Sequence, residues 1–500
     1  MRCGLGLRRP DLKFGIRHSK FPPTLARAGL LSGVLLSRSL TAGSYRTGRA
    51  LNLGYWRGRS PENQGCPTFG DVGQLRGGIG HHALISRIPP ISLTPFPHTL
   101  PMRRLFFLLF LLPWLASAQD DEPRKYDVGG YVKYLHSATF ADLPVPGTPP
   151  GFSYFPLTNN FFHHRLNLFY YPKPAWTVSV QMRNRLFWGE QVKLDPTFGQ
   201  QIDQYPGLLD LSVRWVDNEN LLLHSIFDRA YLKYSQDKWD ITLGRQRINW
   251  GVTTIWNPND LFNALNFLDF DYEERPGNDA LRIQYFPGIL SRAEIAIAPG
   301  RYDSTWIAAG LYRFNAKGYD VQVLGGYYNG DLAVGGGWEG SIGAAGFKGE
   351  GTYFTPLEGL SPDTSATFSG ALSADYMLSN GLYLSGGLLY NQRGGEVANG
   401  QTASLFTGTL NAQPLSPKNL FPAEWTFSLT ASGQPHPLVS LNGTVLYSPQ
   451  DHLTVAVPTV SYSIKENWAL DLVGQVFLSE VQEDFQHVAS SVFFRLKWSY

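Results

Sequence analysis

The chain ends in SSVFFRLKWSY, a stretch whose side chains alternate in character from one residue to the next. The apolar set on one face is Val492, Phe494, Leu496, Trp498 and Tyr500. A period of two residues predicts a β-strand. At an open sheet edge, an apolar face that reaches the chain end would promote aggregation. We therefore expect this strand to close a barrel whose outer face meets lipid.

The same alternation recurs along residues 119–500. In EWTFSLTAS, Trp425, Phe427 and Leu429 share one face, and hydroxyl-bearing residues share the other. Segments of about ten alternating residues, separated by turn residues, are typical of transmembrane β-barrels. A soluble β-sandwich would carry many more charges on its polar face, whereas this face is mostly Ser, Thr, Gln and Asn. The region has no apolar run of roughly 18 residues, so no membrane helix is predicted.

Turn residues divide this region into short and long connections that alternate along the chain. The short ones are residues 172–175, 236–238, 287–290, 315–318, 341–344, 378–381, 433–436 and 465–467. The longer ones are residues 141–159, 191–220, 251–278, 300–304, 329–332, 356–366, 392–424, 448–451 and 479–487. If the first strand starts on the periplasmic side, every short turn falls there, as in outer-membrane barrels. The sequence therefore predicts an all-β fold, a transmembrane antiparallel β-barrel of about 18 strands, with about 16 as the alternative.

The first 118 residues differ from the rest of the chain. Residues 1–101 carry 14 Lys and Arg against three acidic residues, whereas residues 119–500 carry 26 basic and 37 acidic residues. Residues 102–118 have the basic start, short apolar core and A-x-A end of a secretory signal peptide. We expect residues 1–101 to be a disordered, non-native upstream extension, with a long Arg-rich targeting extension as the alternative. Residues 119–500 are then the outer-membrane β-barrel.

Cysteine usage and charge narrow the expected chemistry of the barrel. Both cysteines, Cys3 and Cys66, precede it, so it is expected to have no disulfide and no thiolate metal site. Its acidic balance gives no reason to expect a nucleic-acid partner. It contains no phosphate-binding or hydrolase motif, so the sequence predicts no enzyme activity, no cofactor and no metal. The expected partners are outer-membrane lipids and small solutes.

The link at residues 251–278 is the third on the outer side and runs for about 27 residues without strand alternation, a length that usually marks a functional loop. It combines aromatic residues with acids. The acids are Asp269, Asp271, Glu273 and Glu274. We expect this loop to fold inward and to present its carboxylates to the lumen.

Alternation also places basic side chains on the inner face of the second to seventh predicted strands. The set is Arg165, Arg183, Arg185, Arg229, Lys233, Arg282 and Arg292. One wall of the pore would then be basic, with the loop carboxylates across from it, and fixed charges of this kind select ions. The alternative is that these arginines and acids pair with one another and stiffen the wall. The two interpretations do not exclude each other.

Arg245 and Arg247 present a register problem. Strict alternation would place both in lipid beside Leu243, at a cost of roughly 2–4 kcal/mol for an arginine at the bilayer midplane. A bulge at Gly244 would turn both inward. Alternatively, the strand has already left the membrane at this point. We expect both arginines to join the basic wall.

Three stretches between about residues 240 and 285 carry a resemblance to a known family. GRQRINWG, WNPNDLFN and EERPGNDALR resemble substrate-selective or export-type porins of about eighteen strands from Gram-negative outer membranes. The predicted signal peptide and the aromatic C-terminal strand also resemble features of these porins. The resemblance implies a constriction in which residues 251–278 face Arg183, Arg185 and Arg229. Porins of the general type are trimers, so a homotrimer is one expected assembly.

Together these features predict an outer-membrane channel in which small polar or anionic solutes diffuse past a charged constriction. Arginine favours this role because it binds carboxylate and phosphate well. Two alternatives stay open. One is a structural or adhesive barrel with a blocked lumen. The other is a barrel-embedded hydrolase that uses a histidine such as His224, His436 or His452.

Overall fold

The structure is a computed structural model. It describes residues 125–141, 157–203, 205, 207–264, 267–269, 271, 275, 277–394, 416–450, 452–481 and 484–500. All of them belong to one compact unit, Ile91–Tyr500. The expected upstream extension and signal peptide lie outside the described residues and stay predictions.

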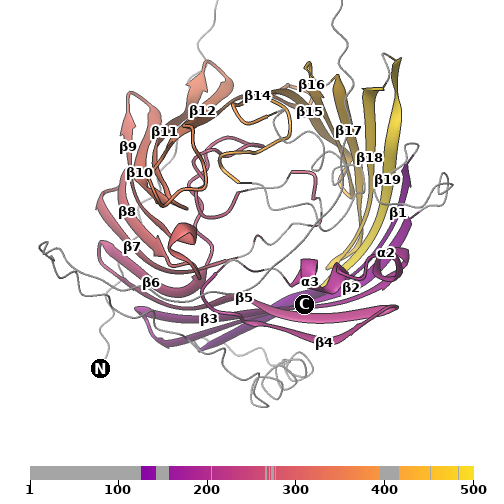
Figure 1. The fold of residues 1–500 in the computed structure, drawn as a ribbon, viewed down its shortest axis with the longest axis horizontal. Coiled ribbons are helices and arrows are strands. Elements are labelled where there is room, and N and C mark those ends of the chain that lie inside the picture. Colours follow the sequence, from indigo (N-terminus) through magenta and orange to yellow (C-terminus); the bar gives the residue numbers. More distant parts are fainter. Residues whose placement is uncertain are drawn as a thin grey trace, which may run out of the picture. The chain divides into compact units, whose positions relative to one another are not determined.

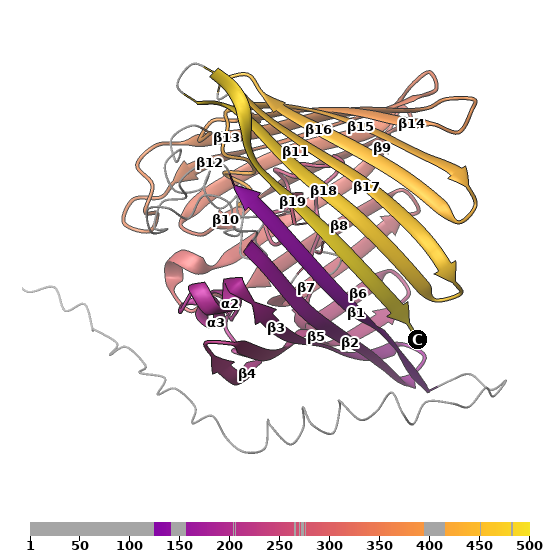
Figure 2. The same cartoon turned by 90° about the vertical axis from the view of Figure 1, so that its right-hand side faces the viewer.

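A single antiparallel sheet closes on itself, because the first strand pairs with the last as well as with the second (Figure 1). The strands are β1 (Tyr126–Ala141), β2 (Leu157–Lys173), β3 (Trp176–Gly189), β4 (Ser212–Asn218), β5 (Leu221–Gln236), β6 (Trp239–Gln246), β7 (Asn278–Gly288), β8 (Ser291–Ala298), β9 (Ile307–Ala316), β10 (Tyr319–Tyr328), β11 (Asp331–Ile342), β12 (Ala345–Pro356), β13 (Thr367–Met377), β14 (Tyr383–Asn391), β15 (Trp425–His436), β16 (Val439–Ser448), β17 (Leu453–Lys465), β18 (Trp468–Val481) and β19 (Asp484–Ser499). The closing ladder runs from Tyr131 opposite Ser499 to Ala141 opposite Ala489. Figure 2 shows the strands inclined to the barrel axis, as closure requires.

Eighteen of these strands close the barrel, which confirms the predicted fold class and strand number. The remaining strand, β4, lies in the link expected at residues 191–220 and pairs only with the outer half of β5. The same link forms two short helices, α2 (Glu190–Leu194) and α3 (Phe198–Ile202), and a 3₁₀ turn, η2 (Asp303–Thr305), precedes β9.

Helices play a minor part in this fold. Among the residues that the structure describes, no helix is both long and apolar enough to cross a membrane.

The expected bulge at Gly244 was wrong. Both ladders of β6 run through Gly244 without a register shift. Gly244 instead has a φ of 115°, a conformation that suits glycine, and β6 ends two residues later, before Arg247. The chain therefore leaves the sheet before Arg247, whereas Arg245 still belongs to β6 and pairs with Ala230 and Asp279.

The outer face of the barrel exposes large apolar side chains on strands all round the ring. Examples are Leu243, Ile295, Val323, Tyr353, Leu429, Leu472 and Phe494. A continuous apolar surface of this extent is unsuited to water and suits the hydrocarbon region of a bilayer. The C-terminal strand contributes to it, because Trp498 stacks on Trp468 of β18.

Candidate functional site

Residues 247–277, between β6 and β7, make contacts far from those two strands. The first half of this loop is held by Glu350 of β12, which accepts hydrogen bonds from the Thr253 hydroxyl (2.8 Å) and the Asn257 amide (3.0 Å). Asn259 reaches Thr352 of β12 (2.8 Å) and the Gly336 carbonyl of β11 (3.0 Å). The loop therefore rests on the inner wall at β11 and β12.

Glycines allow the loop to come this close. A Cβ atom built at Gly335 would lie 3.0 Å from Asn259 Oδ1, and one at Gly337 would lie 3.1 Å from Asn259 Nδ2. Both distances are shorter than most Cβ contacts, so larger residues would push the loop away from the wall. The close packing of the loop against β11 therefore explains why this strand is rich in glycine.

The second half of the loop lies against the opposite part of the ring. The Leu268 carbonyl accepts a hydrogen bond from Gln475 of β18 (2.6 Å). Asp271 pairs with Lys133 of β1 (2.6 Å) and lies 3.5 Å from Arg495 of β19. A segment that touches β11 and β12 at one end and β18, β19 and β1 at the other must cross the interior of the ring, where Figure 1 shows chain inside the circle of strands.

A row of basic side chains lies on the neighbouring wall. Lys133 on β1, His163 on β2, Arg185 on β3 and His224 on β5 are successive cross-strand partners. Opposite residues of an antiparallel pair share one face of the sheet, about 5 Å apart. The ladder therefore aligns four basic groups along the inside of the barrel. Three of them, Lys133, His163 and His224, were not predicted to belong to the basic wall, and His224 was named only as a histidine for the alternative hydrolase.

His163 is the least satisfied member of this row. Its ring is buried between Tyr131 (centroids 5.3 Å apart) and Phe161 (6.4 Å). Neither ring nitrogen has a hydrogen-bond partner among the described residues. Buried polar atoms are normally paired with protein or water, so a polar partner is expected beside this ring.

Arg165 and Arg183 form a second basic pair, two residues along β2 and β3 from His163 and Arg185, and a bulge in β5 supplies their counter-charge. The β3–β5 register shifts between Gln181 and Met182, so Asp228 of β5 is the extra residue. Its carboxylate binds Arg165 (2.7 Å) and Arg183 (2.8 Å) and is fully buried. Arg165 and Arg183 are therefore paired with an acid, which is the alternative interpretation that the sequence left open for the basic wall.

Other predicted basic residues are also occupied. Arg229 donates to the backbone carbonyls of Asp228 (2.8 Å) and Arg275 (2.5 Å). Arg282 pairs with Glu294 on β8 (2.7 Å), which also receives the indole N–H of the loop residue Trp250 (2.7 Å). These contacts hold the loop to the wall.

Arg245 and Arg247 have different surroundings. Arg245 is buried, pairs with Asp279 (2.8 Å) and lies 3.9 Å from the ring centroid of Tyr205. It thereby fastens the segment before β4 to the barrel. Arg247 is exposed at the start of the loop.

Arg185 stands apart because, among the described residues, no carboxylate lies within ion-pair distance of it. Its guanidinium lies 3.3 Å from the His224 ring and over the face of Phe187. Among the predicted arginines inside the ring, Arg185 is therefore the one whose charge is least neutralised by a contacting carboxylate.

The predicted loop acids have separate outcomes. Asp269 and Asp271 lie against the basic wall itself rather than across the lumen from it, and Asp269 accepts a hydrogen bond from the Asp271 backbone (3.2 Å). Burial, together with the nearby charge of Asp271, raises the pKa of Asp269 to about 7. Glu273 and Glu274 lie outside the described residues.

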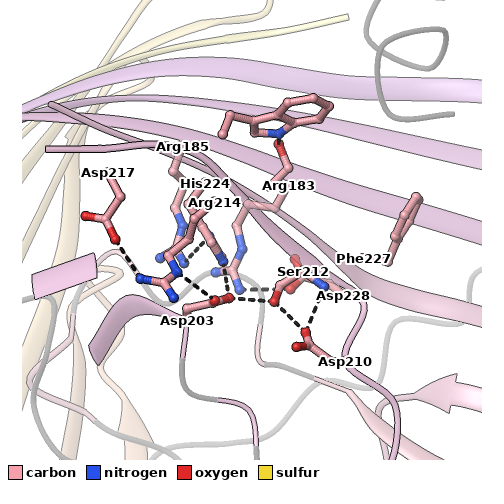
Figure 3. A network of polar contacts seen from close by, with 12 residues as sticks. Arg183, Arg185, Asp203, Asp210, Ser212, Arg214, Asp217, His224, Phe227 and Asp228 are labelled. Atoms are coloured by element: carbon pink, nitrogen blue, oxygen red, sulfur yellow. Dashed lines mark hydrogen bonds and ion pairs between the residues drawn. The ribbon is translucent and has the colours of Figure 1, made fainter. Parts of the chain in front are cut away.

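A polar network joins the basic row to the segment that carries α3 (Figure 3). Asp203 lies 2.9 Å from His224 Nε2 and 3.1 Å from Arg214 Nε, and it accepts the Ser212 hydroxyl at 2.5 Å. Burial alone would raise the pKa of Asp203, but hydrogen bonds from His224 and Ser212 and the charge of Arg214 hold it below its usual value. Ser212 Oγ also lies 2.7 Å from Asp210 Oδ1, so its single hydroxyl hydrogen is shared between two carboxylates, whereas a serine nucleophile needs a hydrogen-bonded base such as histidine.

An apolar row inside the barrel was missed by the sequence analysis. Leu135, Phe161, Phe187 and Leu222 are cross-strand partners one step above the basic row, and all are buried. They belong to a cluster that includes loop residues Trp256, Leu420 and Phe421. The stretch NNFFHHRLNLFYY in β2 carried the signal, since its aromatic residues occupy both faces.

Comparisons with known proteins find similarity in structure only. No protein-family model and no curated protein sequence matches the chain. The crystal structure of Acinetobacter baumannii OccAB4 is 9% identical, has a TM-score of 0.47 and covers 76% of this chain and 100% of that chain. The crystal structure of Pseudomonas aeruginosa OccK11 (OpdR) is 9% identical, has a TM-score of 0.47 and covers 75% of this chain and 95% of that chain. The outer membrane protein opdK of Pseudomonas aeruginosa is 8% identical, has a TM-score of 0.42 and covers 75% and 99% of the two chains.

Proposed function

We propose that this protein is an outer-membrane porin through which small polar or anionic solutes diffuse passively. The carrying observation is the loop at residues 247–277, which crosses the ring from β11–β12 to β1 beside a row of basic side chains. A barrel of this strand number is wide enough for an aqueous interior unless its own chain fills it. The crossing loop narrows that interior at the level of the fixed charges.

Charge gives the proposed pore its preference. Lys133, Arg183, Arg185, Arg229 and Arg495 line or adjoin the narrowed region, and rings or walls of like charge select ions of opposite sign. Arg185 is the strongest candidate for contact with a passing solute, because its contacts are His224 and Phe187 and, among the described residues, no carboxylate lies within ion-pair distance of it. Its flat guanidinium binds carboxylate or phosphate with two parallel hydrogen bonds.

The test is single-channel conductance of the purified protein in a planar bilayer. Discrete open steps with a reversal potential on the anion side in a salt gradient support the proposal. A folded protein that gives no steps contradicts it.

A second candidate is the structural or adhesive barrel with a blocked lumen. The observation in its favour is the apolar cluster inside the ring, where Trp256 packs against Phe421 with ring centroids 6.5 Å apart. If these loops seal the barrel, Phe421→Ala opens conductance that the unmodified protein lacks. If the porin proposal holds, both proteins conduct.

The homotrimer stays a separate prediction. Its measurement is the mass of the detergent-solubilised complex by light scattering with the detergent contribution subtracted. A mass of one chain contradicts it.

A further inference from the structure

Arg245 and Asp279 form an ion pair at the outer ends of β6 and β7. They are cross-strand partners, and their charged groups lie 2.8 Å apart. Arg245 is two residues from Leu243 on β6, and Asp279 is two residues from Leu281 on β7; both leucines are exposed on the lipid side of the sheet. Side chains two residues apart share one face, and neither ladder of β6 has a register shift, so the pair belongs to the lipid side. This differs from the inward position expected for Arg245 from the sequence.

A short segment of the chain encloses this pair. The side chain of Arg245 is 1% exposed and that of Asp279 is 7% exposed. The cover is formed by residues 207–211, which precede β4 and which we call the shield. The Leu209 carbonyl accepts a hydrogen bond from Arg245 Nη2, and the Leu209 N–H donates to Asp279 Oδ2 (2.9 Å). The pair is therefore satisfied by backbone groups of the shield as well as by its own two charges.

The shield spans the outer ends of the strands from β5 to β8. At one end, the Leu211 carbonyl accepts a hydrogen bond from the Phe227 N–H of β5 (3.0 Å). At the other end, Gly207 forms an isolated bridge with Gly300, which follows β8, and its carbonyl accepts a hydrogen bond from Arg301 Nε (3.3 Å). The shield thus continues the wall above β6 and β7, where the loop between these strands turns inward.

Alternation in β4, which the shield enters, identifies the two faces of this part of the wall. Ser212 and Arg214 face the polar network around Asp203 (Figure 3). The opposite face belongs to an apolar cluster of Met182 and Phe227, with Leu211, Val213 and Trp215 packed against it. A polar inner face and an apolar outer face are the pattern of a barrel wall that meets lipid.

Two leucines of the shield remain uncovered. Leu208 is 45% exposed and Leu209 is 51% exposed. They adjoin the outer ends of strands that carry a cross-strand row of exposed apolar residues, Leu243, Leu281 and Ile297. Beyond the Gly207–Gly300 bridge, Tyr302 is exposed as well, and aromatic residues typically mark the edge of the apolar band.

We propose that the shield is part of the membrane-facing wall, with Leu208 and Leu209 in contact with acyl chains of the outer leaflet and the Arg245–Asp279 pair sealed behind them. Continuity with the lipid-facing strands identifies the occupant as hydrocarbon. A charge that met lipid directly would be destabilising, which gives the shield a physical role. The inference goes beyond the proposed function, because it holds whether or not the barrel conducts.

Site-directed spin labelling tests the contact with lipid. In the full chain with Cys3→Ser and Cys66→Ser, a nitroxide is attached at Leu209→Cys and the protein is reconstituted in phosphatidylcholine vesicles. Collisions with oxygen, which concentrates in hydrocarbon, are compared with collisions with a water-soluble nickel chelate. Leu243→Cys is the lipid-facing reference, and Glu219→Cys, at the exposed β4–β5 turn, is the aqueous reference.

The expected oxygen-to-nickel collision ratio at Leu209→Cys resembles that at Leu243→Cys and is several-fold higher than that at Glu219→Cys. A ratio equal to that at Glu219→Cys means that water covers the leucines and overturns the proposal. Few collisions with either reagent mean that another protein surface covers them, which overturns it too.

A second variant tests what holds the shield in place. Arg245→Met combined with Asp279→Leu removes both charges, so no unpaired buried charge is left, but Leu209 loses both partners. The ratio at Leu209→Cys should then fall toward the aqueous reference. Arg313→Met combined with Asp320→Leu is the matched control, because that pair lies on β9 and β10 away from the shield. A ratio that both double substitutions leave unchanged contradicts the role of the Arg245–Asp279 pair.

Discussion

Asp228 is the residue whose removal tests the basic wall most directly. It is fully buried, it is the extra residue of a bulge, and its two oxygens bind Arg165 and Arg183. Asp228→Asn keeps the shape but leaves two arginines without their carboxylate. Removal of one partner from a buried ion pair costs about 3–5 kcal/mol, so we expect the free energy of unfolding to fall by at least about 3 kcal/mol.

The assay is urea-induced unfolding in lipid vesicles, followed by tryptophan fluorescence. Asp240→Asn is the matched control, because Asp240 pairs with Lys233 at a partly exposed site and such pairs contribute about 0–1 kcal/mol. Adding Arg165→Met to Asp228→Asn removes one of the stranded charges and should restore part of the loss. Equal losses for Asp228→Asn and Asp240→Asn would refute the view that the bulge carboxylate neutralises the wall.

Three further outcomes are expected. Arg183→Gln together with Arg185→Gln shifts the reversal potential in a salt gradient toward cations, and an unchanged potential contradicts the basic wall. Because the pKa of Asp269 is raised to about 7, acidification from about pH 8 to pH 6 protonates this side chain, which lies beside Asp271, Lys133, Arg183 and Arg185. Protonation removes a negative charge and raises anion permeability. Asp269→Asn flattens this pH dependence, and a pH profile that the substitution leaves unaltered argues against a role for Asp269. Trp256→Ala removes a buried loop side chain that packs on Phe421, so single-channel conductance increases, whereas Trp425→Ala on the lipid-facing side leaves it unchanged.

Alternation alone was enough to locate the strands. A residue's side in a β-strand depends only on whether its number is odd or even, so EWTFSLTAS already separated Trp425 and Phe427, which the structure exposes outside, from Thr426 and Ser428, which it buries. Turn residues such as those at 172–175 and 236–238 marked the hairpins for an equally local reason, since a hairpin is completed by residues adjacent in sequence.

The partners of the inward-facing charges could not be obtained this way. Asp228 lies next to Arg229, and strict alternation would send one of them to the lipid; the bulge that turns Asp228 toward Arg165 depends on the pairing of β3 with β5. The aromatic row at Phe161 and Phe187 sits on the face that alternation had assigned to polar groups, because the loops that cover it come from elsewhere in the chain.

The sequence by itself determined the barrel and its approximate strand number, because strand periodicity and turn chemistry act over a few residues, whereas the inward course of the loop at residues 251–278 was an expectation that periodicity does not give. Only the tertiary structure decided where that loop ends, which arginines are neutralised, and that Asp271 meets Lys133 across 138 positions of the chain. Contacts at such separation follow from closure of the ring, which brings β1 beside β19. An ion pair between them has no signature in the local sequence, because its energy depends on distance and burial rather than on the neighbouring residues.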